Sequence, residues 1–225
     1  MSERTKIIVA LDYDNKEASF KFIDSIDSNS CRLKIGKELF TKYGPPIIDE
    51  IHKKGFEVFL DLKFHDIPTT VYKACISAFS LNVWMLNIHL SGGYNMAAAA
   101  MKAKNDCQSD SKLIGVTALT SLSDEDCLKI YGCKRLDQLK RLKDIGIDAN
   151  IDGFVCSPYD IKTIRTKNMI FVTPGVRTNN DVNDHHKVIS PKEALELGSD
   201  YIVIGRSITT SPNPSEELEK INDSL

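Results

Sequence analysis

Short apolar runs, rich in β-branched residues, recur eight times along the 225-residue chain, and segments with helical spacing separate them. The runs occupy residues 6–11, 31–36, 57–62, 83–89, 112–119, 152–157, 169–175 and 200–205. Several are apolar on both faces, as are strands buried in a parallel sheet. Strand and helix alternate at about 28 residues per unit, which predicts an α/β protein with the architecture of a (β/α)8 barrel. A doubly wound open sheet shows the same alternation and stays an alternative.

The segments between the runs predict eight helices, and no linker or low-complexity tract interrupts the series. The helices are expected at 16–26, 45–54, 68–80, 95–104, 137–145, 158–165, 191–197 and 214–221. Glycines that follow helix ends, at Gly55, Gly146 and Gly198, are typical of left-handed C-caps. We therefore predict one barrel domain over residues 1–225.

Composition narrows the classes of function. The chain has 29 Lys and Arg against 31 Asp and Glu, so its net charge of −2 favours neither nucleic-acid nor membrane binding. No apolar run approaches the roughly 20 residues of a membrane helix, and no secretory segment begins the chain, which makes the cytoplasm the expected location. The six cysteines are scattered without a C-x-x-C pair. This pattern predicts small core residues rather than a zinc site or disulfides.

Polar side chains stand where the predicted strands end, which is the face of a barrel that carries the chemistry. They are Asp12, Lys34, Asp61, Lys63, His89, Thr120, Ser157, Arg177 and Arg206. Asp61 and Lys63 are two residues apart, so on a regular strand both would point into the barrel mouth. Asp66 follows just before Ile67 and Pro68, and Lys34 from the neighbouring strand would complete a Lys-Asp-Lys-Asp array. Alternating signs lower the cost of burying such charges.

A second polar cluster predicts phosphate binding. The segments TPGVR (173–177) and IVIGRSIT (202–209) fall at or after the ends of strands seven and eight. Barrels commonly bind phosphate there, with backbone N–H groups and a short helix. Gly205 permits a close backbone approach, and Arg206 adds a charged donor.

The motifs together resemble those of the orotidine 5′-phosphate decarboxylase family, in its bacterial form. They appear in the family's order: VALD (9–12), LKIGKELFTKYGP (33–45), FLDLKFHDIPTTV (59–71), NIHLSGG (87–93), GVTALTS (115–121), VCS (155–157), TPGVR (173–177) and VIGRSIT (203–209). The D-x-K-x-x-D-I-P signature in the third segment is the most specific of these.

The resemblance implies the last step of pyrimidine nucleotide synthesis, in which orotidine 5′-monophosphate gives UMP and CO2 without cofactor or metal. Lys63 would donate a proton to C6 of the pyrimidine, and Asp61 would lie beside the substrate carboxylate. Lys34 would bind the ribose and the array, and Asp12 would also hold the ribose.

Further binding roles follow from the same resemblance. Substrate contacts are implied for Ile67, Pro68, Thr120 and Ser121, with the last two near the pyrimidine, and phosphate contacts for Arg177, Gly205 and Arg206, under a closing loop at 174–186. A homodimer is also implied, in which Asp66 and Thr70 reach into the partner subunit's site.

The chain departs from the family pattern at two positions. In place of the usual phosphate-loop glutamine it has the stretch NDHHKVISP (183–191), with His185 the expected counterpart and His186 the alternative. Ser207 replaces the proline that usually follows the G-R pair, a change expected to be mild.

Two other functions stay open. Magnesium-dependent relatives in the superfamily, such as hexulose-phosphate synthase and ketogulonate-phosphate decarboxylase, share the D-x-K-x-x-D strand. They place an acidic metal ligand on the preceding strand, where this chain has Lys34 with Glu38 further on. A non-catalytic nucleotide-binding barrel is the other alternative, against which the intact Asp61, Lys63 and Asp66 argue.

Overall fold

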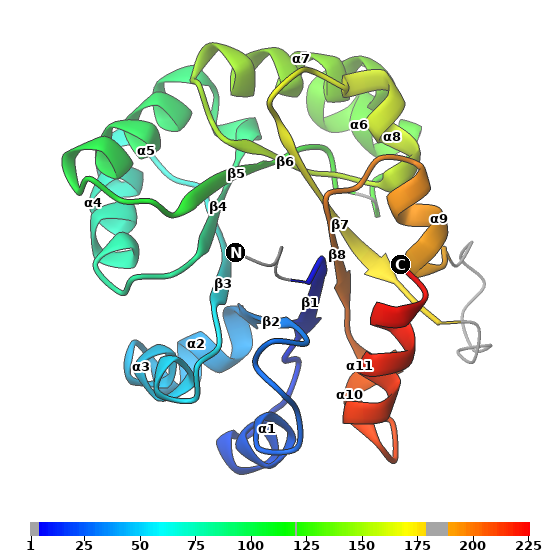
Figure 1. The fold of residues 1–225 in the computed structure, drawn as a ribbon. Coiled ribbons are helices and arrows are strands. Elements are labelled where there is room, and N and C mark those ends of the chain that lie inside the picture. The colour runs from blue at the N-terminus through cyan, green and yellow to red at the C-terminus, as the bar shows by residue number, and fades with distance from the viewer. Residues whose placement is uncertain (1–4, 120, 179–188) are drawn as a thin grey trace. The chain divides into compact units, whose positions relative to one another are not determined.

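The computed structural model describes residues 5–119, 121–178 and 189–225. Its eight strands follow the chain order β1 to β8 around a closed barrel (Figure 1). The strands are β1 (Ile7–Ala10), β2 (Arg32–Gly36), β3 (Val58–Phe64), β4 (Met85–His89), β5 (Lys112–Val116), β6 (Gly153–Val155), β7 (Ile170–Val176) and β8 (Tyr201–Ile204). Each predicted run overlaps one strand, and β3 and β7 extend beyond their runs by two residues and one residue. The predicted (β/α)8 barrel is therefore confirmed, and the open sheet is excluded.

Helices occupy the segments between the strands. They are α1 (Lys16–Ile23), α2 (Lys37–Tyr43), α3 (Pro46–Lys53), α4 (Pro68–Phe79), α5 (Tyr94–Asp106), α6 (Asp124–Tyr131), α7 (Arg135–Asp148), α8 (Pro158–Ile164), α9 (Pro191–Glu196), α10 (Arg206–Thr209) and α11 (Pro214–Asp223), with a 3-10 turn η1 (Leu90–Gly92). All eight predicted helices are present. The sequence argument did not indicate α2, α6 and α10; α10 is a single turn of four residues, too short to show an apolar period.

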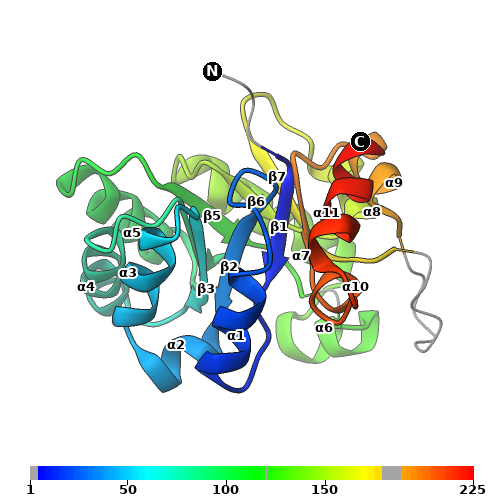
Figure 2. The ribbon, with the colours of Figure 1, turned by 60° about the horizontal axis from the view of Figure 1, so that its bottom comes forward.

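Contacts divide the chain into two compact units, and the first runs up to Asp61 and resumes at Thr173. In this unit β1 pairs in parallel with β2 and with β8. Ile7, Ile8 and Val9 are completely buried, as expected for a strand covered on both faces. The short α10 lies against β1 and α11 (Figure 2).

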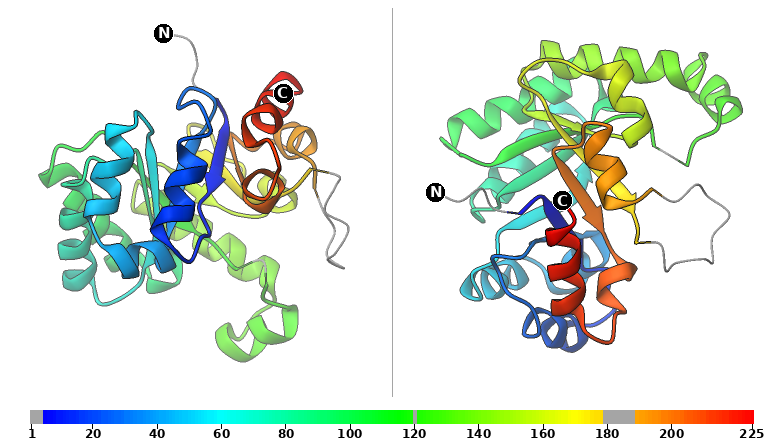
Figure 3. Two further views of the ribbon diagram at one scale, coloured as in Figure 1. Left: turned by 90° about the horizontal axis from the view of Figure 1, so that it is seen from below. Right: turned by 45° about the vertical axis from the view of Figure 1, so that its right-hand side comes forward.

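The second unit runs from Leu62 to Val172. Within it β4, β5, β6 and β7 pair in parallel. Helices α4 and α5 pack side by side, and α6 leads into α7, drawn in green and yellow-green (Figure 3). The rings of Phe154 and Phe171, on β6 and β7, lie 6.1 Å apart in the core. The expectation of one domain over residues 1–225 stays a prediction.

Two of the three glycine predictions are confirmed, and the third is wrong. Gly55 and Gly198 have φ angles of +85° and +106°. Gly146 instead lies inside α7, which continues to Asp148. A Cβ on Gly146 would lie 2.6 Å from the ring of Phe154, so this glycine serves close packing of α7 on β6.

Two expectations from composition concerned the cysteines and membrane-spanning helices. Five of the six cysteines are buried, as predicted for core residues, and Cys107 is half-buried. Among the described residues, no helix combines the length and the apolar character needed to cross a membrane.

Candidate active site

Lys34 on β2 lies between two carboxylates from neighbouring strands. Its Nζ is 3.5 Å from Asp12 Oδ1, just after β1, and 3.3 Å from Asp61 Oδ2 on β3. Gly36 adjoins this contact, because a Cβ built there would lie 3.4 Å from Lys34 Nζ. The structure therefore brings Lys34 and Asp61 together as predicted and adds Asp12 to the same group.

The three side chains differ in exposure. The side chain of Lys34 is 12% exposed and that of Asp61 is 11% exposed, whereas that of Asp12 is 68% exposed. Each charge of the Lys34–Asp61 pair offsets part of the cost of removing the other from water. Asp12 keeps most of its carboxylate open to solvent, where it can accept hydrogen bonds from a ligand hydroxyl. The group thus combines a fixed ion pair with an accessible acceptor.

Lys63 has an unusual backbone conformation near the end of β3. Its φ is +52°, in the left-handed region that non-glycine residues seldom occupy. Its backbone N–H donates a 2.8 Å hydrogen bond to Asn87 Oδ1 on β4. The alternation rule used to orient Lys63 assumes an extended backbone, so that rule does not apply here. The position of its ammonium group in the barrel mouth stays a prediction.

In the first unit, Thr178, which directly follows the first predicted phosphate segment, contacts the second segment. The backbone N–H of Arg177 donates to Ile189 O at 3.1 Å, and the N–H of Thr178 donates to Ser207 Oγ at 3.3 Å. Arg206, at the start of α10, is exposed. A positively charged, solvent-accessible region therefore follows β7 and β8.

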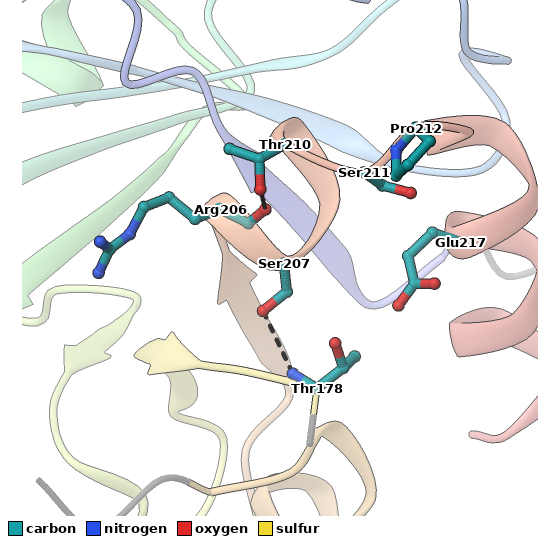
Figure 4. Close-up of a pocket in the computed structure, with 7 residues that line it drawn as sticks. All are labelled: Thr178, Arg206, Ser207, Thr210, Ser211, Pro212 and Glu217. Carbon is teal, nitrogen blue, oxygen red and sulfur yellow. Dashed lines mark hydrogen bonds between the residues drawn. The ribbon is translucent and has the colours of Figure 1, made fainter. Parts of the chain in front are cut away.

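A pocket of about 190 Å³ adjoins this region (Figure 4). It is lined by Thr178, Arg206, Ser207, Thr210, Ser211, Pro212 and Glu217. The Arg206 guanidinium extends away from Glu217, while the Ser207 hydroxyl faces Thr178 (Figure 4). A Cβ on Gly205 would lie 3.9 Å from Asp12 Oδ2, so the end of β8 lies beside the carboxylate that binds Lys34. The phosphate segments and the charged group are therefore parts of one region.

A family model described as "Orotidine 5'-phosphate decarboxylase / HUMPS family" matches residues 5–221. The chain belongs to this family. Two relatives named orotidine 5′-phosphate decarboxylase, from Aliivibrio fischeri (strain MJ11) and Actinobacillus pleuropneumoniae serotype 5b (strain L20), are 46% and 44% identical over 226 residues. The matches cover 98% of this chain and 97% and 98% of the two relatives. A crystal structure of orotidine 5′-phosphate decarboxylase from Lactobacillus acidophilus matches with a TM-score of 0.86 and 33% identity, over 98% of both chains.

In this member of the orotidine 5′-phosphate decarboxylase family, the segment after β3 leads directly into α4. Asp66 Oδ1 accepts a 2.6 Å hydrogen bond from the N–H of Ile67, and Pro68 begins the helix. Ile67 is 64% exposed, and Asp66, Pro68 and Thr70 are exposed too. The predicted contacts of this segment with substrate and with a partner subunit remain predictions.

The pyrimidine contacts expected for Thr120 and Ser121 remain predictions. Ser121 is exposed, in the segment before α6. Thr120 and His185 lie outside the described residues, as do His186 and most of the predicted closing loop. Within the described ranges, no three His, Cys, Asp or Glu side chains form a group that could hold a metal ion. The cation between Asp12 and Asp61 is the lysine ammonium group.

Asn87 is the residue that the sequence argument missed. It is completely buried on β4, and it bonds to the backbone of Lys63, which lies 24 positions earlier in the chain. The available signal was a single amide side chain inside the apolar run 83–89. A buried polar group of this kind requires hydrogen-bond partners, but the sequence alone does not say which.

Proposed function

We propose that this protein converts orotidine 5′-monophosphate into UMP and CO2, the last step of de novo pyrimidine nucleotide synthesis. The observation that carries the proposal is the ion group in which Lys34 joins Asp12 and Asp61, in a member of the orotidine 5′-phosphate decarboxylase family. The reaction develops negative charge on one carbon, and fixed charges can stabilise it without reorganisation.

The proposed chemistry needs neither metal nor cofactor. The bond between C6 and the carboxylate breaks, CO2 leaves, and the electron pair stays on C6. The Lys63 ammonium donates a proton to C6 and is later reprotonated from water. Asp61 lies beside the departing carboxylate, and Lys34 and Asp12 bind the ribose hydroxyls. Each tenfold in rate requires about 1.4 kcal/mol, so one lysine must be supported by the rest of the site.

Phosphate binding supplies that support in the proposal. Arg177, Gly205, Arg206 and His185 hold the phosphate, and Thr120 and Ser121 contact the pyrimidine. The hydrogen bond from the Thr178 N–H to Ser207 Oγ joins the segments that follow β7 and β8, which supports a common phosphate site. Binding energy from a phosphate remote from C6 can be used to organise the reacting end of the substrate.

We also propose a cytoplasmic homodimer with shared sites. Asp66 and Thr70, with Ile67 and Pro68 between them in the chain, would contact the substrate bound by the partner subunit. The exposure of Ile67 supports this assignment, because an apolar side chain that is 64% exposed is a suitable interface residue.

Release of CO2 from orotidine 5′-monophosphate, measured with and without EDTA, tests the reaction. We expect turnover that EDTA does not reduce, and Lys63→Ala should abolish it while the fold remains. Dependence on added Mg²⁺ would favour a metal-dependent sugar-phosphate lyase, and binding of UMP without turnover would favour a non-catalytic barrel.

A mixing experiment tests the shared site. Lys63→Ala and Asp66→Ala proteins, each inactive alone, should regain activity when their subunits exchange, because one hybrid site then has both residues. The matched control mixes Lys63→Ala with a Lys63→Ala/Asp66→Ala double variant, which cannot form a complete site. Equal activity in both mixtures, after proven exchange, would contradict the shared site.

A further inference from the structure

The left-handed backbone of Lys63 needs a physical cause, because a strand residue with a side chain normally has an extended conformation. The N–H of this residue donates a hydrogen bond to Asn87 Oδ1. We propose that Asn87 is a positioning residue that holds Lys63 in this conformation and thereby sets the direction of the proton donor. The proposal rests on the proposed decarboxylase function.

Asn87 is suited to this role because its own position is fixed. It lies in the middle of β4, and it pairs with Ile114 of β5. Leu86 and Ile88, on either side of it, are completely buried, as is Asn87 itself. A side chain held by a paired and fully buried strand cannot follow a moving neighbour. The amide oxygen is therefore a rigid acceptor, and it restricts the orientation of the N–H that it binds.

The residue type also fits. An amide oxygen accepts a hydrogen bond without bringing a net charge close to the lysine. A leucine of similar size would leave the Lys63 N–H without this acceptor. An aspartate would keep the acceptor but add a buried charge. Asn87 thus combines the geometry that Lys63 requires with electrical neutrality.

The test is steady-state kinetics of CO2 release for Asn87→Ala and Asn87→Asp. A displacement of about 1 Å in a catalytic group can lower the rate about 100-fold, so we expect a kcat loss of about that size for Asn87→Ala, with KM within about 3-fold of wild type. Asn87→Asp keeps an acceptor oxygen, and its kcat should be at least about 10-fold higher than that of Asn87→Ala.

Ser111→Ala is the matched control. Ser111 is also buried, its hydroxyl donates to Val83 O, and it lies just before β5, at the opposite end of the strand pair. This variant loses a buried hydrogen bond without touching Lys63, so its kcat should match wild type even if its melting temperature falls. An equal kcat loss in Ser111→Ala and Asn87→Ala would overturn the proposal, because it would assign the effect to general loosening of the strands.

A crystal structure of Asn87→Ala, or of Asn87→Ser if the alanine variant does not fold, gives a second readout that does not depend on the reaction. We expect φ of Lys63 to leave the left-handed region when the acceptor is lost. A φ that stays near +50° would overturn the positioning role. If wild type fails to release CO2 while φ changes as expected, the proposed reaction is wrong and the structural role of Asn87 stands.

Discussion

Replacing Lys34 by methionine removes the cation of the array while keeping the length and the apolar stem of the side chain. The 3.3 Å separation of Lys34 Nζ from Asp61 Oδ2 corresponds to about 5 kcal/mol of attraction at an effective dielectric constant of about 20. Part of this is regained when Asp61 is rehydrated or strengthens its other contacts. Asp12 adds little, because its carboxylate is mostly exposed. We expect Lys34→Met to lower the free energy of unfolding by about 3 kcal/mol, the low end of the range for breaking a buried pair.

A double-mutant cycle measures this interaction directly. Lys34→Met, Asp61→Asn and the double variant are unfolded in urea at pH 7 and one fixed protein concentration, and followed by circular dichroism. Because the double variant leaves no buried charge unpaired, it should be more stable than the sum of the single changes predicts, by about 2 kcal/mol.

An exposed pair is the matched control. Lys129 Nζ lies 2.7 Å from Glu125 Oε1, closer than in the Lys34 pair, but both side chains are at least 70% exposed. Its coupling energy should be below about 0.5 kcal/mol, because water screens the charges. If the two cycles give the same small value, burial does not strengthen the Lys34–Asp61 pair, and the reasoning from its exposed fractions is wrong.

Two further predictions concern phosphate binding and thiol chemistry. Ser207→Ala removes the acceptor for the Thr178 N–H, and the loss of about 1 kcal/mol should raise KM about 5-fold at unchanged kcat. Thr210→Ala, a change in the same pocket, should leave KM unchanged. Equal KM values in the two variants would contradict a role of the Thr178–Ser207 hydrogen bond in phosphate binding. Burial raises the pKa of the Cys75 thiol to about 12. Iodoacetamide at pH 8 should therefore label half-buried Cys107 first and Cys75 only in urea, as read by peptide mass spectrometry; rapid native labelling of Cys75 would contradict its burial.

The barrel could be predicted because the burial of its strands is visible in the pattern of apolar residues. Strands such as β1 are buried on both faces, which requires uninterrupted apolar runs, and the helices between them show an apolar period. Helix α6 was not predicted because its sequence lacks such a pattern. Its apolar residues Leu128 and Ile130 are exposed, and only Cys127 among its described side chains is buried. A helix without a buried face has no period to detect.

One part of the candidate site could be predicted from the sequence and another part could not. The ends of parallel strands lie at one edge, so the meeting of Lys34 and Asp61 follows from the fold class and from their positions in the sequence, whereas the contact of Lys34 with Asp12 was not predicted. The conformation of Lys63 does not follow, because it involves a contact with Asn87 across 24 residues and a backbone angle that no local preference of lysine predicts. Sequence order locates a residue at a strand end, whereas the direction of its side chain depends on partners from other strands.

The register of β3 decides whether the charged group can form at all. Lys34 pairs with Phe59, and Gly36 pairs with Asp61, so the lysine and the aspartate lie two residues apart along adjacent strands. Side chains alternate between faces at every residue, and a slip of β3 by one position would turn Asp61 to the face opposite Lys34. Val58, Phe59 and Leu60 are all buried, so the slip would force three side chains of different shape to repack in the core. Hydrophobic packing near the start of β3 therefore fixes the alignment of the ion pair at its far end, and the chemistry proposed for this site depends on core residues that never touch the substrate.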